Sequence, residues 1–113
     1  MQQYTKKIKR EIRKLAKLAH RRELVEVLKD LESKFGDWED EEMDAFELDH
    51  EIYLYHVQKS RAIFKKYNND GQLDMAVSSA AARGVLEKNE LSDELFELLE
   101  PVIKRYGGSF DRF

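Results

Sequence analysis

The 113-residue sequence contains no cysteine and only one proline. Without cysteine the chain has no disulfide, no thiolate metal ligand and no cysteine nucleophile. Glycine is also scarce, with five residues, while 38% of the residues are charged. Few helix breakers together with many charges are typical of helical proteins rather than of disordered chains or β-sandwiches. We therefore expect an all-α fold.

Long hydrophobic runs are missing as well. No apolar stretch approaches the roughly 20 residues that span a bilayer, and the basic first residues lack the apolar region of a signal peptide. We expect a cytoplasmic protein that does not act at a membrane. A chain of this length has room for one domain, which we expect to cover residues 1–113 with residues 108–113 as a frayed tail.

The first third of the chain has the spacing of a helix. Two apolar stripes recur at intervals of three and four residues, and their members are Ile8, Ile12, Leu15 and Ala19, followed by Leu24, Leu28, Leu31 and Phe35. Because the stripes are out of phase, either one long helix changes its buried face near His20 or two helices meet there. Thr5 to Lys29 contains no Gly, Pro, Ser, Asn or Asp, which favours a single helix over about residues 5–35.

A second helix is expected over residues 45–67. Asp44 and Glu47 form a capping-box pattern at its start, and residues 68–71 (Asn-Asn-Asp-Gly) form a turn at its end. Its apolar residues fall on two faces, one of which contains Phe46, Tyr53, Val57, Phe64 and Tyr67. A helix that is apolar on two faces is usually buried between neighbours, so we place it at the centre of the domain.

The last third of the chain predicts two more helices. We expect one from Leu73 to Leu86 and another that begins after Ser92, is bent or interrupted at Pro101 and ends at Gly107. The expected fold is thus an all-α single-domain bundle of four to five helices, mainly antiparallel, with a long basic N-terminal helix.

Charge is divided by sign along the chain. Residues 1–22 hold nine Lys or Arg and one Glu, a net charge of +8, while residues 23–113 hold eleven basic and twenty-two acidic residues, a net charge of −11. Like charges four residues apart on a helix cost about 0.2–0.5 kcal/mol a pair, so we expect an anionic surface nearby. It can be the acidic remainder of the chain, the same surface of a second subunit, a nucleic acid or anionic lipid, of which lipid is least expected because the apolar face of this helix has no Trp or Phe. The residues we expect to contact it are Lys6, Lys9, Arg10, Arg13, Lys14, Lys17 and Arg21.

One polar group has the spacing of a metal site. Glu47 and His50 form the Glu-x-x-His pattern of di-iron and di-manganese carboxylate bundles, and Glu51 lies beside them. Such a site normally needs a second Glu-x-x-His, which this chain lacks. We therefore expect no metal and no other cofactor, and we take these residues as a weaker polar candidate.

Arg13 and His20 form a second pair with a chemical precedent. Their spacing resembles the Arg-then-His motif of HEPN domains, which are all-α RNases, and the resemblance covers these two residues. It implies a histidine that acts as general acid or base beside an arginine that holds a phosphate. His50 and His56 are the other histidines available for such a role.

These observations favour a protein without chemistry of its own. We expect a helical interaction or regulatory module that acts through protein contacts and through self-association as a homodimer. The alternative is a nucleic-acid-binding protein or small RNase-like enzyme that uses the basic helix and a histidine.

Overall fold

The computed structural model describes residues 4–107, and within this range the chain is helical without strands. Its elements, in order, are α1 (Lys6–Glu39), α2 (Ala45–Leu54), a π-helical turn (Tyr55–Ser60), α3 (Arg61–Tyr67), a 3-10 turn (Asp70–Gln72), α4 (Leu73–Ala82), a second 3-10 turn (Lys88–Glu90) and α5 (Asp93–Arg105). The expected frayed tail, residues 108–113, lies outside the described residues. None of the helices in the described range is long and apolar enough to cross a membrane.

Both apolar stripes of the first third of the chain lie on one long helix, as the lack of breakers predicted. α1 runs for 34 residues and is capped by Thr5, whose side chain accepts a hydrogen bond from the backbone N–H of Ile8. The π turn joins α2 and α3 into one continuous helical run, because the residues at both of its ends keep right-handed helical backbone angles. The described part of the chain therefore contains four long helical runs, which confirms the all-α bundle.

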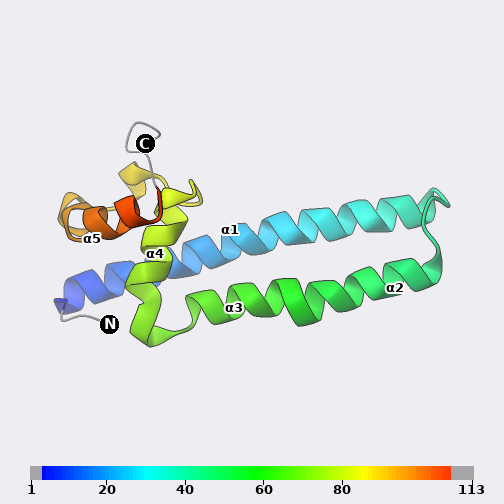
Figure 1. The fold of residues 1–113 in the computed structure, drawn as a ribbon, viewed down its shortest axis with the longest axis horizontal. Helices are drawn as coiled ribbons and strands as arrows, with labels where there is room; N and C mark the ends of the chain where they lie inside the picture. The colour runs from blue at the N-terminus through cyan, green and yellow to red at the C-terminus, as the bar shows by residue number, and fades with distance from the viewer. Residues whose placement is uncertain (1–3, 108–113) are drawn as a thin grey trace.

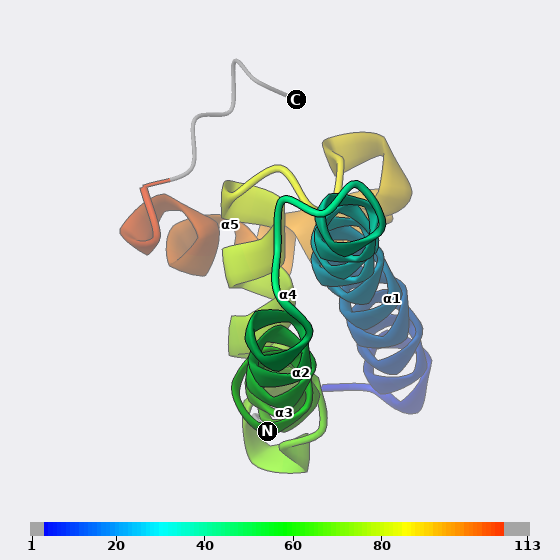
Figure 2. The ribbon, with the colours of Figure 1, turned by 90° about the vertical axis from the view of Figure 1, so that its right-hand side faces the viewer.

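Two parts of the molecule are distinct in Figure 1. α1 and the α2–α3 run lie antiparallel and form a long hairpin, while α4 and α5 pack beside the N-terminal half of α1. Figure 2, which looks along the hairpin, shows the two long helices beside each other and α5 on the far side of α4. We call residues 24–64 the hairpin arm. The body consists of the N-terminal half of α1 together with α4 and α5, which pack on it.

The hydrophobic core lies in the body. Its fully buried side chains come from α1, α4, α5 and the segment before α5, and they include Ile12, Val77, Leu86, Leu95 and Leu99. Small residues of α4 such as Ala80 and Ala81 are buried in the same cluster, which allows close approach to its neighbours. α1 is therefore the central element, since both α4 and the α2–α3 run pack on it.

The prediction that helix 45–67 lies at the centre is wrong. Only Leu48, Ile63 and Tyr67 of this run are buried, whereas Phe46 is 84% exposed and Tyr53 is 56% exposed. The run does have apolar residues on two faces, but its main neighbour, α1, covers only one of them.

The π turn explains why Tyr67 is buried although its spacing groups it with Phe46 and Tyr53. A π turn contains one residue more than an α turn, and one residue advances an α-helix by about 100°. The extra residue therefore turns Ile63 and Tyr67 onto the face of Leu48. Sequence spacing alone assumes a constant period and so places Tyr67 on the wrong face.

Two further boundaries differ from the expectation. α4 ends at Ala82 rather than Leu86, because Gly84 adopts a φ of +81° and its N–H bonds to the carbonyl of Ala81. Left-handed backbone after the last helical turn stops a helix, and glycine adopts it without steric cost. α5 is not interrupted at Pro101 but continues to Arg105, with fully buried Leu99 and Ile103 on either side of the proline.

Candidate interaction surface

The seven basic residues predicted to contact a partner lie on the surface of α1 away from the core. The buried residues of this half of the helix are Ile8, Ile12, Leu15, Ala16 and Ala19. Lys9 is half-buried and the other six are exposed. Within residues 4–107, none of the seven forms an ion pair with a carboxylate. The acidic remainder of the described chain therefore leaves these positive charges unneutralised by direct contact.

Two other basic residues of α1 do pair with the body. Arg22 donates two hydrogen bonds to the Glu90 carboxylate, each 2.6 Å long, and a third to the carbonyl of Val85 at 2.7 Å. The hydrogen bonds from Arg22 hold the pKa of Glu90 below its usual value. Lys7 approaches Glu94 at 4.0 Å with both side chains well exposed, so this pair adds little.

Glu11 fixes the start of α5 on α1. Its carboxylate accepts hydrogen bonds from the Ser92 hydroxyl at 2.6 Å and the Ser92 N–H at 2.8 Å. The same hydroxyl accepts from the N–H of Leu95 and so caps α5, as the sequence predicted. Sequence reasoning missed the role of Glu11, although it stands out as the one acidic residue among nine basic residues in residues 1–22.

Glu23 joins α1 to α3 and α4. Its side chain, 12% exposed, accepts hydrogen bonds from Tyr67, Lys66 and Arg83. Burial by itself would raise the pKa of Glu23, but these three donors lower it on balance. Burial and the bond to Glu23 together raise the pKa of Tyr67. This cluster clamps the base of the hairpin, and no sequence motif pointed to it.

The HEPN-like pair is not brought together as a catalytic pair. His20 is half-buried, stacks on Tyr67 with ring centres 5.9 Å apart and meets the edge of Phe64 at 6.1 Å. Arg13 is exposed and forms no hydrogen bond with His20 in the described part of the chain. His56, the third histidine considered, is exposed on the π turn.

The polar candidate of α2 has a structural role at one residue. Glu47 accepts a hydrogen bond of 3.3 Å from the N–H of Asp44, whose carboxylate accepts one from Phe46, so the capping box is present as predicted. His50 stacks against Tyr53 with ring centres 6.2 Å apart. Across residues 4–107 there is no place where three or more His, Cys, Asp or Glu side chains converge as a metal would need, Glu51 included.

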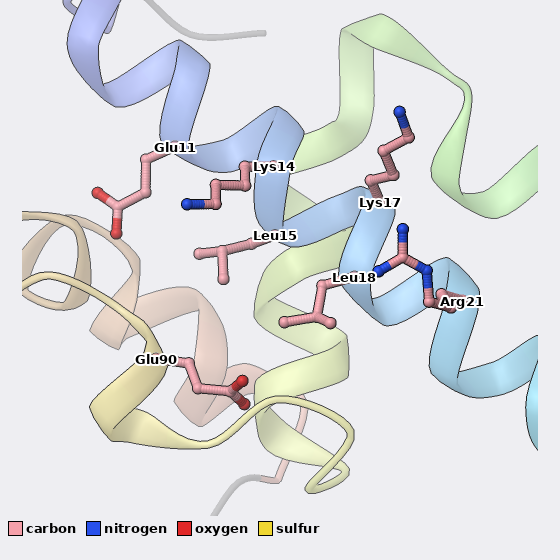
Figure 3. A pocket seen from close by; sticks show the side chains of 7 residues that line it. All are labelled: Glu11, Lys14, Leu15, Lys17, Leu18, Arg21 and Glu90. Atoms are coloured by element: carbon pink, nitrogen blue, oxygen red, sulfur yellow. The ribbon is translucent and has the colours of Figure 1, made fainter.

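An open groove of about 530 Å³ lies between α1 and the turn before α5. Figure 3 shows Leu15 and Leu18 on its α1 wall and the Glu90 carboxylate opposite. The remaining lining residues are Glu11, Lys14, Lys17 and Arg21. Glu11 and Glu90 are already hydrogen-bonded to Ser92 and Arg22. The groove thus has leucine side chains on one wall and, beside them, cations that pair with no carboxylate within residues 4–107.

The exposed large hydrophobic side chains are concentrated on the hairpin arm. Nine of the twelve that are exposed in the described range belong to it, namely Val25, Leu28, Phe35, Trp38, Phe46, Ile52, Tyr53, Val57 and Phe64. Only three of the twelve, Met75, Leu98 and Tyr106, lie outside the arm.

The chain matches no protein-family model, no curated protein and no solved structure. The function has to be inferred from the surface itself.

Proposed function

We propose that the chain is a non-enzymatic interaction module that acts through protein contacts of its hairpin arm, including self-association as a homodimer. The observation that carries this proposal is the exposure of nine large hydrophobic side chains along the arm. Two antiparallel helices bury only the stripe where they touch, so their outer faces remain available to further helices.

The shape of the molecule supports this proposal. Its radius of gyration is 17.1 Å and its extents are 53 × 29 × 20 Å, whereas a compact chain of this size has a radius of gyration of about 13 Å. The excess comes from the arm, which extends past the body (Figure 1). A protruding helical pair is accessible to a partner along most of its length.

The arrangement of polar groups also favours binding over catalysis. His20 and His50 take part in ring contacts, and the carboxylates in the groove are engaged by Ser92 and Arg22. No described histidine is hydrogen-bonded to a carboxylate or an arginine, the arrangement that would orient a general acid or base.

Nucleic-acid binding is the second candidate because seven cations of α1 have no carboxylate partner within residues 4–107. The competing observation is the acidic remainder of the chain, with a net charge of −11 over residues 23–113. An acidic surface repels the phosphate backbone, so binding would have to use α1 alone.

Sedimentation separates the two functions. We expect a dimer at micromolar protein concentration in both low and high salt, because an apolar interface with a charged rim depends on salt mainly in its association rate. The same samples with mixed-sequence RNA or DNA should sediment as without it. A monomer at every salt concentration that shifts only with nucleic acid, and loses this shift steeply as salt rises, would reject the interaction module and favour the alternative.

A further inference from the structure

A single stripe of α1 lies on the side opposite the α2–α3 run. Glu23 and Asp30 mark the side that faces this run, since they contact Tyr67 and Lys59. A position two residues away lies about 200° around the helix. The opposite stripe therefore follows spacings of four and three, and its members are Lys14, Leu18, Arg21, Val25, Leu28, Glu32, Phe35 and Glu39.

The residue types along this stripe are complementary to those of the same stripe running in the opposite direction. Read forward, it is basic, apolar, basic, apolar, apolar, acidic, apolar and acidic. In an antiparallel pair centred between Val25 and Leu28, every basic position meets an acidic one and every apolar position meets an apolar one. The opposing pairs are Lys14 with Glu39, Leu18 with Phe35, Arg21 with Glu32, and Val25 with Leu28, each occurring twice.

We propose that two copies of this chain pair through α1, antiparallel and about a two-fold axis between Val25 and Leu28. This inference rests on the self-association in the proposed function and assigns it a surface, a direction and a register. Antiparallel helices with apolar residues at spacings of four and three pack by interdigitation. A two-fold axis makes each contact reciprocal, as a closed dimer requires.

The charged residues of the stripe are available for these contacts. Lys14, Arg21, Glu32 and Glu39 are exposed, and none forms a hydrogen bond or an ion pair with another residue of the described range. Arg22, the immediate neighbour of Arg21, is by contrast fully used by Glu90 and Val85. The stripe therefore holds charges that the monomer leaves unpaired, in the positions that the second copy would complement.

The apolar residues have matching space. Two hollows lie along the stripe: the groove of about 530 Å³ at Leu18 and a smaller one of about 170 Å³ lined by Val25, Leu28, Lys29 and Glu32. The proposed register brings Phe35 of the second copy to Leu18, at the groove in Figure 3. Val25 and Leu28 are 43% and 46% exposed, so both can still lose contact with water on pairing.

Charge beyond the stripe acts in the same direction. The end of the arm, residues 37–51, contains nine acidic residues and no Lys or Arg. In the antiparallel register it approaches the basic half of the other α1, where Arg13 and Lys17 flank the stripe. The stripe itself spans about 38 Å at 1.5 Å per residue. Pairing over this length brings the two acidic arm ends to the two basic bodies.

A charge reversal tests the register directly. Arg21→Glu alone and Glu32→Arg alone should each weaken self-association about tenfold or more, because each places like charges together twice in the dimer. An equimolar mixture of the two single variants should restore the dimer, since every such contact between the two chains is then of opposite sign. The double variant should form a homodimer for the same reason. Sedimentation velocity over a concentration series measures all four.

Matched controls keep the folding and charge effects apart. Glu26→Arg and Arg61→Glu change charge at exposed residues of the arm that have no partner in the described range, and they should leave the dimer unchanged. Circular dichroism should show unchanged helix content in every variant. If the single variants dimerise normally, or if their mixture stays monomeric, the register is wrong while self-association stands. A wild-type chain that is monomeric throughout would reject both the pairing and the homodimer of the proposed function.

Discussion

Three charged residues of α1 connect it to other helices, although most charged side chains of this helix form no hydrogen bond or ion pair within residues 4–107. Glu11, Arg22 and Glu23 each reach a residue more than 40 positions away in the sequence. Glu23 has the most partners, with donors on α3 and α4. Because its side chain is largely buried, loss of its charge leaves these donors without an ionised acceptor.

Glu23→Gln should lower the free energy of unfolding by about 1–2 kcal/mol at pH 7, since hydrogen bonds to a charged group are worth more than neutral ones but Lys66 and Arg83 are partly exposed. The pKa of Glu23 is lower in the folded protein, so its contribution is present above its unfolded pKa and disappears as pH falls through the folded pKa. Below the usual value of 4.5 the difference between wild type and variant should therefore shrink. Urea unfolding at pH 7 and in stepwise more acidic buffers measures this difference.

Glu26→Gln is the matched control, because Glu26 is exposed one turn further along α1. It should change stability little at any of these pH values. A difference between wild type and Glu23→Gln that stays constant into strong acid would show that Glu23 does not act through its charge.

Asp44→Ala should lower stability by about 0.5–2 kcal/mol, because it removes the carboxylate that accepts a hydrogen bond from the N–H of Phe46 and so caps α2. Asp49→Ala in the same helix is the control, since Asp49 is exposed and caps nothing. Urea melts followed by circular dichroism compare the two. An unchanged midpoint with an unchanged slope for Asp44→Ala would mean that the cap does not limit unfolding.

At the scale of helices, the π turn decides which residues of the α2–α3 run face α1. Leu48 precedes it, while Ile63 and Tyr67 follow it, and all three are buried. The extra residue of the π turn corrects the phase between these two groups. π turns of this kind often lie at functional sites, and this one contains the exposed Val57 and follows the exposed Tyr53.

Deletion of Gln58 should convert the π turn into an α turn and rotate everything after it by about 100°. Ile63 and Tyr67 would then leave α1, and Tyr67 would lose Glu23. We expect a loss of about 2–5 kcal/mol, comparable to truncating a large buried side chain. Gln58→Ala, which keeps the chain length, is the control and should be near neutral, because Gln58 is exposed. Equal stability of the deletion variant and the control would contradict this account of the phase.

Local signals in the sequence located the helices well. The absence of helix breakers from Thr5 to Lys29 correctly predicted one helix. Asp44 and Ser92 both cap the helices that they were expected to cap. These signals depend on neighbours three or four residues away. The position of the 45–67 helix and the phase of Tyr67 depend on which other helix is near and on one inserted residue, and residue spacing contains neither.

The candidate surface could be predicted only in part for the same reason. Segregated charge identified the basic face of α1, and all seven residues do lie on that helix. Residue spacing does not show that these seven side chains lack carboxylate partners in the described part of the chain, because this depends on contacts between distant residues such as that of Arg22 with Glu90. Two residues with the spacing of a chemical motif, Arg13 and His20, were not enough to place a site.

At the scale of the whole molecule, burial is uneven. The body contains the fully buried side chains of Leu86, Leu95, Leu99 and Ile103. In the arm, Ile63 is buried at the base, and Leu48 is the one buried side chain beyond it. Free energy of local opening follows the amount of apolar surface that an element buries. The arm should therefore open without unfolding the body.

Hydrogen exchange followed by mass spectrometry tests this difference. In dilute protein, amides of residues 33–54 should exchange at least about tenfold faster than those of α5, since a small difference in opening free energy has this effect. α2 should lose protection together with the end of α1, because each is the other's only extended neighbour in the arm. Equal protection of arm and body would show that the molecule opens as one unit. If the α1 pairing is correct, a higher protein concentration should slow exchange in the C-terminal half of α1 more than in α2, because pairing covers the stripe and leaves the outer face of α2 exposed.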